Sequence, residues 1–114
     1  MTSAYKLSEQ INNLWQKHLP LMKSRIETIQ LAVTGLQEGR LPQDIRVASK
    51  QAAHKLAGSL GTFGLEAASS EASEIEQLLT DELSAANATE LSQRLTRIKQ
   101  AIDQRGCDSS TVRA

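Results

Sequence analysis

The sequence predicts an all-α protein, an antiparallel four-helix bundle with an N-terminal helical extension or a kinked first helix. Apolar residues recur at steps of three and four in successive stretches, which is the spacing of one buried face on a helix. No segment alternates apolar and polar residues for long with the period of two typical of strands, and only 3% of the residues are aromatic. The 114 residues, 39% of them hydrophobic, are enough for one domain with one modest core.

The first predicted helix carries a long apolar stripe that continues in phase across Pro20. This phasing favours one long kinked helix, although proline lacks the backbone N–H and can also separate two helices. In both cases the same face is expected to be buried. Its residues are Leu7, Ile11, Leu14, Trp15, Leu19, Met22, Ile26, Ile29, Val33 and Leu36.

A connection marked by Gly39 and Pro42 ends this first part, and the second helix is predicted to run from about Gln43 to Phe63. Gly64 follows the last apolar residue of that helix, where a residue able to adopt positive φ commonly closes a helix. The expected core residues of the second helix are Ala53, Leu56, Leu60 and Phe63.

Two further helices are predicted in the second half of the chain. Asn87 and Glu90 resemble a capping box, so Asn87 is the expected N-cap of the last helix. From Gly106 onward the sequence has no periodicity, so we expect a bundle domain over residues 1–105 and a flexible tail or linker over 106–114. The two apolar stripes are Leu65, Ala68, Ala72, Ile75 and Leu79, and then Leu91, Leu95, Ile98 and Ile102.

Charge and composition exclude several classes of partner. The 13 basic and 13 acidic residues cancel, so no strong attraction to nucleic acid or to an anionic membrane surface is implied. No apolar run approaches membrane-spanning length, and the first residues lack the hydrophobic segment of a secretory signal. The single cysteine, Cys107, cannot form an intramolecular disulfide, which suits a reducing compartment. We therefore expect a cytoplasmic protein.

His54 lies on the polar side of the second helix. At about 100° per residue, its side chain points roughly 140° away from the centre of the apolar stripe. Glycine inside a helix costs about 1 kcal/mol relative to alanine, so two glycines on this outer face need a reason. Open access to the imidazole is one reason, and close helix packing or a fraying helix end is another. The neighbours on this face are Lys50, Gln51, Ala57, Gly58 and Gly61.

The residues around His54 resemble the histidine-containing phosphotransfer (HPt) domains of two-component phosphorelays. The central helix of that family carries a pattern close to His-x-Leu-Lys-Gly-Ser-x-x-x-x-Gly. The organisation of the chain fits this family up to about Arg105, but only about a dozen positions near the histidine are specific. The matching residues are His54, Leu56, Gly58, Ser59 and Gly64.

This resemblance implies a phosphoprotein in which His54 accepts a phosphoryl group from the aspartyl phosphate of a receiver domain and passes it on. The receiver, part of a response regulator or a hybrid histidine kinase, would hold Mg²⁺, whereas this chain needs no cofactor, no metal and no catalytic apparatus of its own. Neutral histidine is a nucleophile at physiological pH without a general base. The family further implies that Nε2 reacts while a hydrogen bond orients Nδ1, and Gln51 is one candidate partner for Nδ1.

One position departs from the family pattern. The family often has a lysine three residues after the histidine, where this chain has Ala57. Lys50 lies one turn before His54 and about 40° around the helix, whereas Lys55 is displaced by about 100°, so Lys50 is favoured as the cation near the phosphoryl group. Gly58 and Gly61 are expected to leave room for the partner.

Two alternatives remain open from the sequence. One is a helical interaction module whose glycine-lined face binds a partner without chemistry, and the other is the dimerising histidine domain of a kinase. The second is weaker because that domain is usually a two-helix hairpin, whereas this chain has the helices for a complete bundle and is expected to be a monomer. His18 has no cysteine nearby and gives little support for a zinc site. A nucleotide-binding glycine-rich loop between a strand and a helix is also absent from the sequence.

Overall fold

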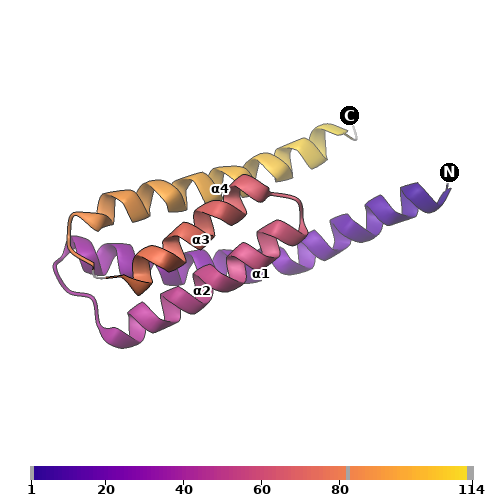
Figure 1. Ribbon diagram of the computed structural model, residues 1–114. Helices are drawn as coiled ribbons and strands as arrows, with labels where there is room; N and C mark the ends of the chain where they lie inside the picture. The colour runs from indigo at the N-terminus through magenta and orange to yellow at the C-terminus, as the bar shows by residue number, and fades with distance from the viewer. Residues whose placement is uncertain (1, 82, 113–114) are drawn as a thin grey trace.

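A computed structural model describes residues 2–81 and 83–112, with side chains over 7–81 and 83–105. The order of helices is α1 (Thr2–Gln37), α2 (Gln43–Thr62), α3 (Glu66–Thr80) and α4 (Asn87–Val112). Both α1 and α3 pack against α2 and α4, and Figure 1 shows successive helices running in opposite directions with the two termini at one end. The all-α, antiparallel four-helix bundle predicted from the sequence is therefore confirmed.

The helix α1 continues without interruption through Pro20, so the proline does not separate two helices. Its buried face, however, begins only at Trp15. Leu7, Ile11 and Leu14 are 56%, 40% and 50% exposed, and the prediction that they belong to the core is wrong. The physical reason is length, because α1 extends beyond the end of the α2–α3 pair (Figure 1).

The other predicted stripes form the core. In α2, α3 and α4 the apolar residues at steps of three and four are buried, as their spacing indicated. Phe63 and Leu65, at the end of the α2–α3 pair, are half-buried and pack against this core. The residues with no exposed surface include Ala53, Leu56, Leu60, Ala72, Ile75, Leu79, Leu91 and Ile98.

A tight turn joins α2 to α3 and depends on one glycine. Gly64 has φ +77°, as expected for a residue that closes a helix with left-handed backbone. Its N–H donates to the carbonyl of Gly61 at 3.0 Å, and the N–H of Leu65 donates to that of Leu60 at 2.9 Å. This pair of bonds is a Schellman motif, which satisfies carbonyls that the end of α2 leaves open.

The ends of α4 differ from the expectation. The side chain of Asn87 does not act as the N-cap, because its Oδ1 accepts the N–H of Ser84 at 2.9 Å while the Glu90 carboxylate bonds Arg94. This bond closes the turn that leads into α4, and Asn87 is itself the first residue of that helix. The helix then runs to Val112, so residues 106–112 are helical where an irregular tail was expected, and 113–114 lie outside the described residues.

Polar contacts tie α3 to both of its neighbours. Arg46 of α2 closes the C-terminal end of α3: its Nε donates to the carbonyl of Leu79 at 2.7 Å, and its Nη2 donates to those of Thr80 and Asp81. A cation at this end also opposes the negative pole of the helix dipole. Because Arg46 lies near the start of α2, this contact holds the end of α3 beside it.

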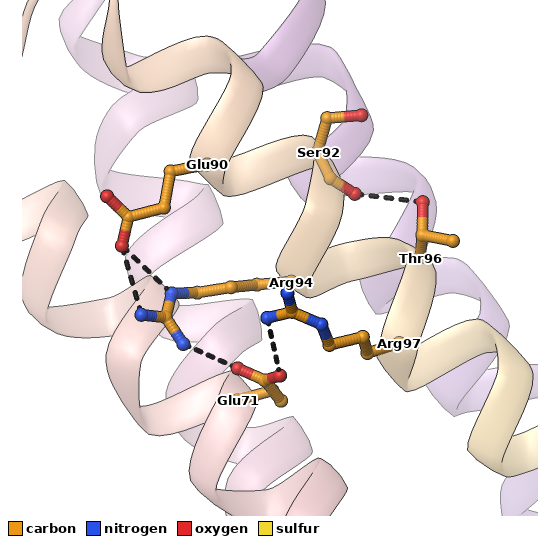
Figure 2. Close-up of polar contacts among 6 residues, drawn as sticks. All are labelled: Glu71, Glu90, Ser92, Arg94, Thr96 and Arg97. Atoms are coloured by element: carbon orange, nitrogen blue, oxygen red, sulfur yellow. Dashed lines mark hydrogen bonds and ion pairs between the residues drawn. The ribbon is translucent and has the colours of Figure 1, made fainter.

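On the opposite side of α3, Glu71 accepts hydrogen bonds from two arginines of α4 (Figure 2). The Glu71 side chain is only 16% exposed, and Arg94 also bonds Glu90 one turn before it. Burial alone would raise the pKa of Glu71, but the hydrogen bonds and charges of Arg97 and Arg94 outweigh it, so this pKa lies below its ordinary value. The ionised carboxylate thus links α3 to α4.

Candidate functional site

His54 lies in the middle of α2 on the face that the core does not cover. Its side chain is 74% exposed, whereas Ala53 before it and Leu56 after it have no exposed surface. The helical spacing therefore produces the expected geometry, with an accessible imidazole on a helix anchored by its opposite face.

The Nδ1 atom of His54 lies 3.1 Å from Oε1 of Glu76 on α3. An ionised carboxylate only accepts hydrogen bonds, so in this contact Nδ1 carries the hydrogen and donates it. The neutral ring then holds its free lone pair on Nε2, the nitrogen that points away from Glu76. Gln51 was the candidate partner for Nδ1 from the sequence, and the contact in the structure is with Glu76.

A shallow depression of about 420 Å³ surrounds the imidazole. Both candidate lysines line it together with Gln51 and the Glu76 carboxylate. Lys50 is half-buried and Lys55 is exposed. Two lysines thus line the depression around the imidazole, together with the one carboxylate that contacts Nδ1.

The three small residues that follow His54 on α2, Ala57, Gly58 and Gly61, differ in how much space surrounds them. A Cβ added to Gly58 would meet nothing within 4 Å, so this position is open to solvent. At Gly61 the same atom would stand 3.4 Å from Oγ of Ser69, so this glycine also allows α3 to lie close. Ala57 is half-buried, and its carbonyl accepts a hydrogen bond from Ser69 at 2.7 Å. Of the three, Gly58 leaves the most room beside the imidazole.

Two other residues considered from the sequence lie away from the imidazole. His18 is on α1, where its Nδ1 lies 3.2 Å from the carbonyl of Leu14 and its ring stands edge-on to Phe63. The Oγ of Ser59 accepts a hydrogen bond from Arg25 of α1. Among the described side chains, no group of three or more His, Cys, Asp or Glu is arranged to hold a metal ion.

Glu76 is the residue of this site that the sequence analysis missed. It follows the buried Ile75 and so lies at the edge of the α3 core face, which the stripe alone could have indicated. Its position opposite His54 depends on how far α3 is shifted along α2, and no pattern in the sequence states that shift.

Comparisons with known proteins agree with this arrangement. A family model described as Hpt domain matches residues 13–106, which covers all of α2 and α3 and most of the remaining bundle. No curated protein and no solved structure matches the sequence significantly. Over residues 2–81 and 83–112, none of the helices has the length and apolar character that a membrane crossing requires.

Proposed function

Since the chain belongs to the Hpt domain family, we propose that His54 accepts a phosphoryl group from the aspartyl phosphate of a receiver domain and passes it on in a two-component phosphorelay. The observation that carries this proposal is the exposed imidazole, oriented through Nδ1 by Glu76 with Nε2 left free. An exposed nucleophile on a rigid helix is what a protein substrate can reach.

The proposed transfer needs no added base, because the attacking nitrogen carries no hydrogen that has to be removed. The Nε2 lone pair attacks phosphorus, the N–P bond forms, and the bond from phosphorus to the aspartyl oxygen breaks, so that the aspartate leaves as a carboxylate. The hydrogen on Nδ1 stays in place, and the phosphorylated ring therefore carries a positive charge beside the Glu76 carboxylate. Onward transfer is the same exchange in reverse, with the aspartate of a second receiver as the attacking group.

Positioning and charge stabilisation dominate phosphoryl transfer, so the two proteins can divide the work. The receiver supplies the acidic pocket and its Mg²⁺, while this chain supplies the nitrogen and, from Lys50 or Lys55, a cation near the transferred oxygens. In this proposal the chain is a phosphocarrier that holds no metal or cofactor and has no catalytic apparatus of its own.

The test is incubation with phosphorylated receiver domains from the same genome, followed by detection of label on this chain. We expect one acid-labile, base-stable phosphoryl group, lost in His54→Gln and retained in His18→Gln, which replaces the only other histidine. Label persisting in His54→Gln would exclude His54 as the site. If the chain is instead an interaction module without chemistry, no receiver labels it and His54→Gln changes binding only slightly.

A further inference from the structure

A depression of about 310 Å³ lies where the α1–α2 connection meets the α3–α4 connection. Figure 1 shows both connections at the end of the bundle opposite the two termini. Part of its lining is apolar, since Leu36 is buried and Leu41 and Leu83 are half-buried against the core. We call it the loop-end pocket, and its lining consists of these three leucines, Arg40, Arg46, Ser84 and two small residues.

Two arginines give the loop-end pocket a positive charge. Among the described residues that line it, none is acidic. Arg46 donates from Nε and Nη2 to carbonyls at the end of α3, and carbonyls are neutral. The carboxylate of Asp81, which follows α3, bonds Gln77 instead. Over residues 7–81 and 83–105, neither Arg40 nor Arg46 forms an ion pair, whereas two arginines of α4 share a glutamate.

Backbone contacts hold both connections around the loop-end pocket. The N–H of Arg40 donates to the carbonyl of Gly35 at 2.6 Å, so this connection folds back onto the last turns of α1. A Cβ added to Gly35 would lie 2.5 Å from the Arg40 carbonyl oxygen, so only glycine allows this approach. In the other connection, the N–H of Ser84 donates to Oδ1 of Asn87 at 2.9 Å. A pocket whose backbone is already held loses less conformational freedom when it binds a ligand.

We propose that the loop-end pocket binds a short aliphatic carboxylate, with its anionic group between Arg40 and Nη1 of Arg46 and its alkyl chain against the leucines. A guanidinium group matches a planar carboxylate and forms strong, charge-assisted hydrogen bonds with it. Nη1 of Arg46 donates to no acceptor among the described residues, because the bonds to α3 use Nε and Nη2.

The size and place of the loop-end pocket set the length of the ligand and its relation to His54. Small-molecule pockets begin at about 300 Å³, so this one holds a chain of a few carbons and not a long lipid. Arg46 precedes His54 on α2 by about 12 Å of helix rise. The site is therefore separate from the imidazole and does not depend on whether His54 carries a phosphoryl group.

Hexanoate is the probe, and its binding to the full chain is followed through backbone amides by ¹H–¹⁵N NMR. We expect amides of residues 39–46 and 83–85 to shift. Hexanoate should bind at least tenfold more tightly than acetate, which lacks the chain, and than hexylamine, which lacks the anion. Arg40→Gln should weaken hexanoate at least tenfold, and Arg40→Glu should weaken it further. Arg40 is preferred to Arg46 for this test because its side chain is exposed and does not close α3.

Two controls keep the test specific. Lys17→Gln removes the same charge from an exposed position of α1 and should change hexanoate affinity less than twofold. His54→Gln should also bind hexanoate like wild type, whatever the outcome of the phosphorylation experiment. Hexanoate binding no tighter than acetate or hexylamine, wild-type affinity in both Arg40 variants, or an equal loss in Lys17→Gln or His54→Gln would each overturn the site.

Discussion

Oε1 of Glu76 on α3 lies 3.1 Å from Nδ1 of His54 on α2, so one helix carries the imidazole and its neighbour orients it. The carboxylate is one-third exposed and the imidazole three-quarters exposed. The contact therefore adds little to the stability of the bundle and acts mainly on the ring, through its tautomer and its direction.

Replacing Glu76 should slow phosphoryl transfer without unfolding the protein. An orienting hydrogen bond worth about 1 kcal/mol corresponds to a roughly fivefold loss in rate for Glu76→Ala. Glu76→Gln keeps an acceptor for Nδ1 but removes the charge, so its loss should be smaller. Imidazole ¹⁵N NMR at a pH where the ring is neutral should show a lower Nδ1–H population in Glu76→Ala only. An unchanged tautomer population and rate would remove Glu76 from the site.

The basic residue near the phosphoryl group is expected to be Lys50. An exposed charge contact is worth about 1 kcal/mol or less, so Lys50→Ala should lower the transfer rate or the phosphohistidine lifetime a fewfold. Lys55→Ala is the matched control from the same depression and should do less. Ala57→Lys added to Lys50→Ala should restore the loss if the phosphate needs one nearby cation. No effect of Lys50→Ala at all would contradict this assignment.

Alanine at two glycines of α2 and its turn should shift stability in opposite directions. Gly58 is helical with open space around it, so Gly58→Ala should raise the free energy of unfolding by up to about 1 kcal/mol. Gly64 has the same open space but φ +77°, so Gly64→Ala should lower it by about 1 kcal/mol. Urea unfolding measures both. Equal shifts would mean that backbone conformation does not distinguish the two positions.

The buried face of each helix was predictable from the sequence. How far each helix is covered by its neighbours, and how far one helix is shifted along another, were not. The spacing of three and four around Leu56 buries one face of α2 and exposes His54, and this depends on a single helix. Leu14 repeats the same pattern, yet it is exposed because burial requires a neighbouring helix of sufficient length. The meeting of His54 with Glu76 likewise depends on the turn at Gly64 and on contacts between helices, for which one sequence carries no periodic signal.

The lowered pKa of Glu71 predicts how its stabilising contribution varies with pH. A carboxyl group whose pKa is lower when folded stabilises the protein above its ordinary pKa of 4.5, and this contribution disappears as pH falls through the folded value. At pH 7 Glu71→Gln should therefore reduce the free energy of unfolding by about 2 kcal/mol, because Arg94 and Arg97 lose a charged partner.

The difference between wild type and Glu71→Gln should narrow as pH drops below about 4.5, which urea unfolding across pH can measure. Glu74→Gln, at an exposed position of the same helix, is the control and should change stability by about 0.5 kcal/mol or less at any pH. A pH-independent difference for Glu71→Gln would show that the ion pairs are not its cause.

The guanidinium of Arg46 links α2 and α3 at the end of the pair that the turn does not join. The Schellman turn at Gly64 joins the two helices covalently at one end, and Arg46 joins them again at the other through the last carbonyls of α3. His54 and Glu76 lie between these two closures. Sliding α3 by one turn would bring Ala72 or Thr80 opposite the imidazole, and neither has a carboxylate. The alignment of His54 with Glu76 thus depends on a contact at the far end of the hairpin, away from the imidazole itself.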